Sequence, residues 1–176
     1  MSFAVFQQLS PSSVVDCCLF ASFTSADANN LVLSRGDRLE VYELHRATNR
    51  LVYSLSIPLF GRPEAIGSFR PRPGAPENLA LVFRKARYLS VLRYDPDLGS
   101  ARTCGQHLLI AADDPAAASL PVGFQPQISV DPENRCVAVR SMPDRVVVFP
   151  VADDSTWALD SQQSLTQLVG GLPFRQ

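Results

Sequence analysis

Polar and apolar positions follow the same order in three stretches of the chain, residues 29–44, 77–96 and 133–151. Each stretch begins with an acid or an amide followed by Asn, and an apolar run comes next. A basic or polar turn then leads into a second apolar run. Two apolar runs around a short polar turn are typical of a β-hairpin, so the sequence predicts the same hairpin three times.

The strands predicted for these hairpins are rich in valine and aromatic residues, which favour extended backbone. In the first hairpin, Leu39 and Val41 alternate with polar neighbours at the period of two expected of a strand. Gly36 supplies a permissive backbone, so we interpret Arg35-Gly36-Asp37 as a hairpin turn and not as an adhesion loop. The predicted pairs are 31–34 with 39–44, 79–83 with 88–94, and 136–139 with 146–151, the last around the turn 141–144.

Four further apolar segments, residues 3–9, 14–23, 51–60 and 64–71, are interpreted as additional strands. Residues 113–126 are rich in Asp, Pro and Ala and are predicted to form an inserted loop. Polar residues dominate the stretch 152–176, which we expect to be a linker or tail that is partly disordered.

The spacing of the hairpins indicates a structural repeat. Asn30 and Asn78 are 48 residues apart, and Asn78 and Asn134 are 56 residues apart because the predicted loop lengthens the second interval. Four-stranded units that recur at about 40–50 residues are the signature of β-propeller blades. We therefore expect an all-β fold in which residues 1–151 form a partial β-propeller of about three four-stranded antiparallel blades. A β-sandwich or a split barrel is the alternative.

Three blades are too few for a closed ring, since closed propellers have about 4–8. We therefore expect the chain to be an N-terminal fragment of a larger propeller, with apolar blade surfaces exposed to water. Such surfaces predict aggregation or poor solubility when the chain is expressed alone.

Composition narrows the class of protein. The chain of 176 residues is 46% hydrophobic and 19% charged, which is ordinary for a globular domain, and its net charge of −1 indicates no polyanionic partner. Four cysteines without a CxxC motif favour a reducing compartment. The absence of a basic residue before Arg35 argues against a targeting peptide, and no apolar run approaches the roughly 20 residues that cross a bilayer.

Residues that could carry catalysis or hold a metal are few. Cys104 and His107 supply only two of the four ligands that structural zinc requires, and His45 follows the first hairpin. The acid pairs at 113–114 and 153–154 are interpreted as solvated turns. No nucleotide-binding loop or nucleophile motif occurs. The sequence therefore predicts no enzymatic activity, no cofactor, no metal and no small-molecule substrate.

One charge asymmetry lies between residues 62 and 93, where seven basic residues face two acidic ones, Glu64 and Glu77. A basic patch in this region could contact phosphates or an acidic partner, although charges that protect a strand edge give the same pattern. The candidate patch residues are Arg70, Arg72, Arg84, Lys85, Arg87 and Arg93, with Arg62 nearby.

Several stretches resemble a family of large proteins built from three β-propellers. They read "AVFQQLSPSSVVDCCLFASF", "NLVLSRGDRLEVYEL", "LVFRKARYLSVLRYDP" and "VDPENRCVAV" followed by "VVVFPV". The family includes the largest subunit of the cleavage and polyadenylation specificity factor, the large subunit of the UV-damaged-DNA-binding protein, and a splicing factor 3b subunit. The resemblance covers about residues 3–151 and concerns the first propeller of these proteins.

Within the family, residues 83–96 and 130–136 are most similar to the polyadenylation-factor subunit, although Tyr88 is an additional residue there. Residues 23–31 and 69–74 are more similar to the UV-damage subunit. The first resemblance implies a non-enzymatic nuclear scaffold of pre-mRNA 3′-end processing, with WD-repeat and zinc-finger subunits as partners and indirect contact with pre-mRNA. The second implies an adaptor in DNA repair and ubiquitin ligation. An unrelated small β protein that binds a ligand between its strands is a third hypothesis.

Overall fold

The computed structural model describes residues 13–83, 88–109 and 123–151, and these residues form eleven β-strands and no helix. The strands belong to three antiparallel sheets, and strands that follow each other in the chain pair with each other within each sheet. Sheet 1 contains β1 (Cys17–Ala21), β2 (Asn30–Arg35), β3 (Arg38–His45) and β4 (Arg50–Pro58). Sheet 2 contains β5 (Ala65–Phe69), β6 (Asn78–Phe83), β7 (Tyr88–Asp95) and β8 (Ser100–Leu108). Sheet 3 contains β9 (Gln127–Val130), β10 (Cys136–Met142) and β11 (Arg145–Pro150).

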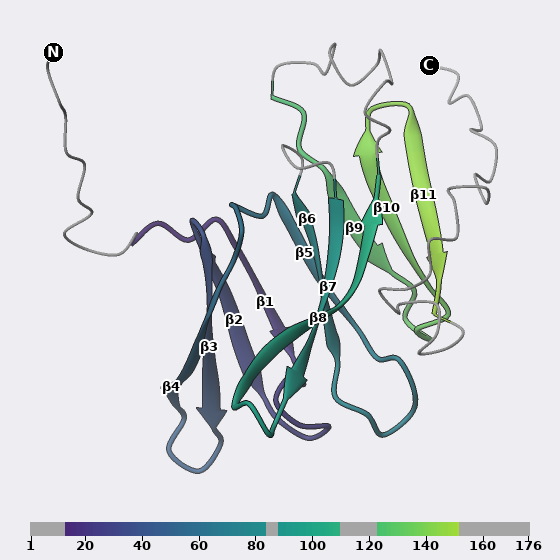
Figure 1. Ribbon diagram of the computed structural model, residues 1–176. Helices are drawn as coiled ribbons and strands as arrows, with labels where there is room; N and C mark the ends of the chain where they lie inside the picture. The colour runs from purple at the N-terminus through teal and green to yellow at the C-terminus, as the bar shows by residue number, and fades with distance from the viewer. Residues whose placement is uncertain (1–12, 84–87, 110–122, 152–176) are drawn as a thin grey trace, which may run out of the picture.

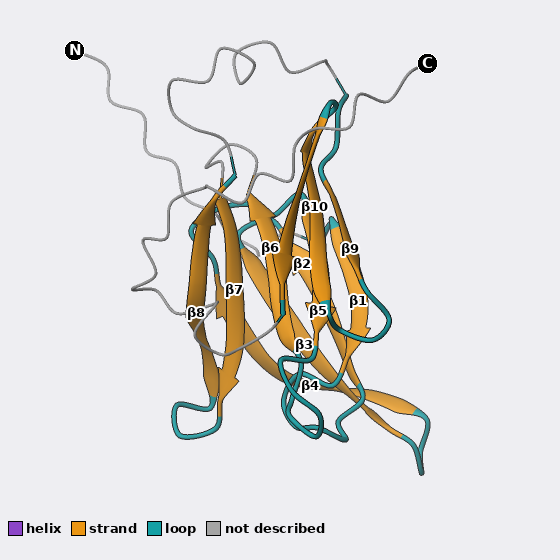
Figure 2. Cartoon of the chain, turned by 90° about the vertical axis from the view of Figure 1, so that its right-hand side faces the viewer, coloured by secondary structure: helices purple, strands orange, loops and turns teal. Residues whose placement is uncertain are grey.

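The three sheets stand side by side, and sheet 2 lies between the other two (Figure 1). Strand β1 contacts β5, and β5 contacts β9, so the first strands of the three sheets are neighbours. A second view shows the long axes of the strands running in broadly similar directions (Figure 2). Sheets that follow one another around a common line of first strands are the arrangement of propeller blades. No part of the chain that the structure describes forms a helix long and apolar enough to cross a membrane.

Because successive side chains of a strand point to opposite sides, each sheet has two different faces. We call one face of each sheet the forward face. It carries the side chain of the first residue of the second strand, which is Asn30 in sheet 1, Asn78 in sheet 2 and Cys136 in sheet 3. The opposite face is the rear face. The forward face of sheet 1 packs on the rear face of sheet 2, and the forward face of sheet 2 packs on the rear face of sheet 3.

Strand β6 demonstrates this arrangement, since both of its faces are buried. Leu79 and Leu81 join the cluster between sheets 1 and 2, whereas Ala80 and Val82 join the cluster between sheets 2 and 3. All four side chains are at most 1% exposed. Full burial of a Leu or Val side chain contributes about 1.5–3 kcal/mol, so β6 holds the three sheets together.

A glycine allows sheets 2 and 3 to approach closely. Gly67 lies in β5, and a Cβ atom at this position would be only 2.7 Å from Cγ2 of Ile128 in β9. Real Cβ atoms essentially never come this close to another heavy atom. The lack of a side chain at Gly67 therefore sets the distance between the first strands of these two sheets.

The predicted fold class is confirmed, because the described residues form only β-sheets that pack as partial propeller blades. Sheets 1 and 2 have the four strands expected, and sheet 3 has three within the described residues. The predicted turn at Arg35-Gly36-Asp37 is also confirmed, with a φ of 62° at Gly36 between the paired residues Arg35 and Arg38. The predicted strand 3–9, the turn 84–87, most of the loop 113–126, and the tail 152–176 lie outside the described residues.

The turn predicted at 141–144 was too long, because β10 continues to Met142 and only Pro143 and Asp144 form the turn. Ser141 and Met142 are both buried, at 3% and 1% exposure, and burial keeps them in the sheet. The register shifts between Val139 and Met142, and this irregularity interrupts the apolar alternation that the sequence prediction relied on.

The repeat based on three asparagines also needs correction. Asn30 and Asn78 each begin the second strand of a four-stranded sheet and are completely buried. Asn134 instead lies in the turn before β10, with a φ of 57° that Asn tolerates better than most residues. The sequence motif therefore marks equivalent positions in two sheets and a different position in the third.

Candidate functional site

The structure describes three residues of the predicted basic patch. Arg70 and Arg72 follow β5, and Arg93 lies on β7, beside Asn78 of β6. The guanidinium of Arg93 donates a hydrogen bond from Nε to Oδ1 of the buried Asn78, at 3.4 Å. Arg84, Lys85 and Arg87 lie outside the described residues. The patch as a contact surface for phosphates or acids stays a prediction.

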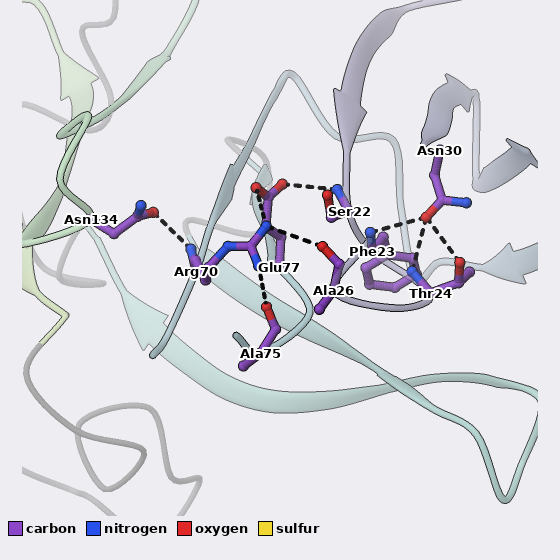
Figure 3. Close-up of polar contacts among 9 residues, drawn as sticks. All are labelled: Ser22, Phe23, Thr24, Ala26, Asn30, Arg70, Ala75, Glu77 and Asn134. Carbon is purple, nitrogen blue, oxygen red and sulfur yellow. Dashed lines mark hydrogen bonds and ion pairs between the residues drawn. The ribbon is translucent and has the colours of Figure 1, made fainter. Parts of the chain in front are cut away.

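Arg70 forms contacts with all three sheets or with loops between their strands. Its guanidinium lies 3.6 Å from the carboxylate of Glu77 and donates to the carbonyl oxygens of Ala75 and Ala26 (Figure 3). Its backbone N–H donates to Oδ1 of Asn134, at 2.8 Å. Ala26 belongs to the loop after β1, and Asn134 to the turn before β10. Arg70 therefore joins sheet 2 to both of its neighbours.

Glu77 forms a reciprocal link between sheets 1 and 2. Its carboxylate accepts a hydrogen bond from the backbone N–H of Ser22, and its own N–H donates to the carbonyl oxygen of Ser22. The sequence placed Glu77 at the start of a predicted hairpin and among the acids of a basic region, and assigned its side chain no role. Its position directly before Asn78 in the repeated acid-or-amide–Asn pattern was the signal that could have indicated this structural role.

Asn30 continues the polar network into sheet 1. Its side-chain oxygen accepts three hydrogen bonds, from the backbone N–H groups of Phe23 and Thr24 and from the hydroxyl of Thr24, all at 2.9–3.0 Å (Figure 3). The network thus runs from Asn134 through Arg70 and Glu77 to the loop that Asn30 holds. Its side chains satisfy backbone groups at one end of the sheets, and this indicates a structural role.

A cleft of about 930 Å³ lies between sheets 1 and 2, at the end of these sheets opposite the polar network. Its lining includes the apolar side chains of Leu81 and Leu92 and the hydroxyls of Ser90 and Thr103. Phe60, in the connection from β4 to β5, is fully exposed at the rim. The lining also includes Asp16, Arg62 and Glu64, so the cleft combines apolar, neutral polar and charged groups.

The connection that borders the cleft is held in place by several polar contacts. Asp16 accepts a hydrogen bond from the N–H of Gly36, at 2.8 Å, and forms an ion pair with Arg62. The backbone N–H of Leu59 donates to the carbonyl oxygen of Asp37. Burial, followed by the carboxylate of Asp16, raises the pKa of the Cys17 thiol above its ordinary value. A raised pKa keeps this thiol protonated and therefore a poor nucleophile at neutral pH.

The two histidines lie apart. His45 is exposed at the end of β3, and His107 lies in β8 with its ring 5.1 Å from the ring of Phe149 in β11. Burial lowers the pKa of His107. Among residues 13–83, 88–109 and 123–151, no three His, Cys, Asp or Glu side chains are grouped so that they could hold a metal ion.

Comparison with known proteins identifies the family. The family model described as the RSE1/DDB1/CPSF1 first beta-propeller matches residues 14–169, most of the chain. The chain belongs to this family. The match agrees with the predicted resemblance to the three-propeller proteins and with the packing of sheets 1 to 3.

Two curated proteins show the same relationship at the level of sequence. Protein CFT1 of Kluyveromyces lactis is 29% identical over 103 residues, which is 58% of this chain and 8% of that protein. Cleavage and polyadenylation specificity factor subunit 1 of Drosophila melanogaster is 28% identical over 130 residues, which is 73% of this chain and 9% of that protein. The aligned part of this chain therefore spans less than a tenth of the length of either relative.

Proposed function

We propose that the protein is a non-enzymatic scaffold of the nuclear machinery that cleaves and polyadenylates pre-mRNA. The observation that supports this function is the similarity to the Drosophila cleavage and polyadenylation specificity factor subunit 1, which covers 73% of the chain. The family match to the first propeller of related proteins supports it further. Localisation in the nucleus follows from the process itself.

The described polar groups fit a scaffold. Asn30, Arg70 and Glu77 direct their side chains to backbone groups and to each other, and so they position loops. Asp16 and Arg62 do the same for the connection between sheets 1 and 2. These side chains stabilise the stacking of the sheets, and a rigid stack of sheets presents surfaces to partners.

The partners that we propose are the WD-repeat and zinc-finger subunits of a 3′-end processing complex, with pre-mRNA contacted indirectly through them. The basic residues of sheet 2 are a proposed contact for an acidic segment of a partner or for RNA phosphates. Arg72 is the member best suited to a variant, because Arg70 and Arg93 contact other residues of the protein. Residues 152–176 are proposed to be a tail outside the blades.

Affinity purification of the tagged chain from nuclear extract tests this function. Mass spectrometry is expected to identify polyadenylation-factor subunits, including the WD-repeat and zinc-finger proteins. A variant with Arg72, Arg84, Lys85 and Arg87 replaced by Glu tests the basic residues. It is expected to retain its fold and to recover fewer acidic or RNA-bound partners than the unchanged chain. Recovery of cullin-type ligase subunits in place of the polyadenylation subunits would overturn the proposal and favour the DNA-repair adaptor.

A further inference from the structure

Strands β4 and β8 are the outer strands of sheets 1 and 2, and no strand among the described residues pairs with the outer edge of either. An unpaired edge offers its backbone N–H and C=O groups to any extended segment that meets it. Proteins commonly protect such edges with charged side chains. The two strands differ in this protection.

The two strands occupy the same place in equivalent sheets. The pairing of β3 with β4 shifts in register after Val41, and the pairing of β7 with β8 shifts after Val91. Val41 and Val91 are both completely buried on the forward faces of their sheets. Beyond the shift, residues 51–53 of β4 pair with β3 as residues 101–103 of β8 pair with β7. These two sets of three residues therefore correspond one to one.

The edge of β8 is protected at these positions, whereas that of β4 is not. In β8, Arg102 places a charge on the edge strand and forms an ion pair with Asp95 at 3.6 Å. Its neighbours in β8 are the small residues Ala101 and Thr103. At the equivalent positions β4 has three large apolar or aromatic side chains with exposed fractions of 48%, 48% and 55%, namely Leu51, Val52 and Tyr53.

Stacking a further sheet on the protein would not cover this edge. Val52 lies on the forward face of sheet 1, which already packs on sheet 2, and it is still exposed. Each new sheet begins beside the first strand of the sheet before it, because β5 contacts β1 and β9 contacts β5. Neither sheet 2 nor sheet 3 pairs with the outer strand that precedes it in the chain. A sheet on the rear face would therefore cover Leu51 and Tyr53 but leave Val52 and the backbone edge open.

The charges of β4 define the kind of segment that fits the edge. Residues 50–58 contain one formally charged residue, Arg50, and no acid. Arg50 is exposed on the forward face, two positions before Val52, and its cross-strand neighbour is His45, while Glu43 lies opposite Val52. An added strand with an acid beside Arg50 gains an attractive cross-strand pair. A second copy of β4 brings no acid to that position.

We propose that the outer edge of β4 binds an extended segment of a partner protein as a fifth strand of sheet 1. In such complexes main-chain hydrogen bonds give affinity, and the alternating side chains give specificity. The added strand is antiparallel, as are the three pairs that sheet 1 already contains. The proposal goes beyond the role in polyadenylation and does not depend on it.

This orientation specifies the sequence of the segment. The residues that face positions 53, 52 and 51 of β4 follow one another along the segment and are apolar, to match the exposed side chains there. The next residue faces Arg50 and is acidic. The partner therefore carries three consecutive apolar residues followed by Asp or Glu.

A synthetic octapeptide tests the proposal. Its central residues are Ile, Val, Ile and Asp in that order, with Ser and Thr on both sides and blocked termini. Titration of the labelled peptide with the chain measures affinity, and amide hydrogen exchange by NMR locates the binding site. The peptide is expected to slow exchange at those amides of β4 that exchange fast in the chain alone.

Val52→Arg gives β4 the residue that β8 has at the equivalent position, and it is expected to weaken peptide binding by about 10-fold or more. Leu98→Arg is the matched control, since Leu98 is 68% exposed in the turn after β7 and its replacement is expected to leave binding unchanged. Slow exchange in β6, which is buried on both faces, shows that each variant folds. If Val52→Arg lacks it, Tyr53→Thr replaces that variant on the same edge and is expected to act in the same direction.

A charge exchange tests the acidic position. Arg50→Glu is expected to weaken binding of the Asp peptide about 5-fold and to strengthen binding of a peptide with Lys in place of Asp by a similar factor. Equal effects on the two peptides would show that no acid lies beside Arg50 and would overturn the proposed motif.

Other results would overturn the proposed edge itself. They are absence of binding at millimolar peptide, binding with unchanged exchange in β4, and equal affinity for the wild type and Val52→Arg. Protection of β4 without peptide that increases with the concentration of the chain, and that Val52→Arg abolishes, would show that a second copy occupies the edge.

Discussion

At the scale of single residues, the stability of this protein depends on a few buried polar side chains that hold loops. Asn30 is the clearest case, because it is completely buried and one oxygen accepts three hydrogen bonds. Such a group is costly to remove, since the donors that it satisfies stay in the protein without an acceptor.

Replacing Asn30 with Ala is expected to lower the free energy of unfolding by about 2–3 kcal/mol, because the N–H groups of Phe23 and Thr24 lose their acceptor. The matched control is Asn29→Ala. Asn29 is the preceding residue, and its side chain bonds only at the surface, to Arg46 and to the carbonyl oxygen of Asp27, so the loss there is expected to be below about 0.5 kcal/mol. Denaturant unfolding measures both values, and equal losses would contradict the role of Asn30.

A second residue, His107, makes stability depend on pH. Burial lowers its pKa in the folded protein below the ordinary value of 6.5. The unfolded chain therefore binds a proton near pH 6.5 when the folded protein does not, and the free energy of unfolding decreases as the pH falls below that value. His107→Gln is expected to reduce this dependence between about pH 7 and pH 5.

Thermal unfolding at a series of pH values measures the effect of His107→Gln. His45→Gln is the control, because it removes the exposed histidine and leaves the contact between His107 and Phe149 intact. The control is expected to keep the pH dependence that His107 contributes. A variant lacking His107 whose stability changes with pH as steeply as that of the wild type would exclude this explanation.

At the scale of elements, the spacing between sheets is set where the first strands meet. Gly67 in β5 faces Ile128 in β9, and there is no room for a methyl group between them. The cost of overfilling such a contact comes from moving packed side chains or backbone.

Gly67→Ala is expected to destabilise the protein by about 1–3 kcal/mol, because its Cβ would overlap Cγ2 of Ile128. Ile128→Ala removes that methyl group. In a double-mutant cycle, the combined variant is therefore expected to lose less stability than the sum of the two single variants. Strictly additive losses would show that Gly67 and Ile128 do not meet as described.

Elements also show what the sequence could and could not predict. Strands with buried alternation, such as β2, β3 and β6, were predictable because their apolar residues recur every second position or fill the whole strand. Strand β8 was not predicted individually, since Ser100–Leu108 includes Arg, Thr, Gln and His side chains on an outer strand. An outer strand is held by backbone pairing with its neighbour, and its side chains give little apolar signal.

The candidate site was less predictable than the fold. A run of basic residues in sequence does not show which of them form internal contacts, and the structure shows such contacts for Arg70 and Arg93. The importance of Asp16 and Glu77 depends on partners 20 and 55 residues away in the chain, Gly36 and Ser22. Contacts at such separations follow from the packing of sheets and leave no local pattern.

At the scale of the whole molecule, sheet 1 packs on sheet 2 and sheet 2 packs on sheet 3. Each sheet therefore buries apolar side chains against a neighbouring sheet. Strand β6 is buried on both faces because sheet 1 lies on one side and sheet 3 on the other. Strand β4, in contrast, is the outer edge of sheet 1, and most of its residues are exposed. The burial of β6 and the exposure of β4 are therefore direct consequences of the stacking, and they can be measured.

Amide hydrogen exchange, followed residue by residue by NMR, tests the stacking most directly. The three-sheet arrangement predicts the slowest exchange in β6 and β7, and fast exchange at every second amide of β4, where no strand among the described residues pairs with its outer edge. If the strands instead formed one continuous sheet, β4 would pair with β5. Protection of all β4 amides to the level of β6 would contradict the account.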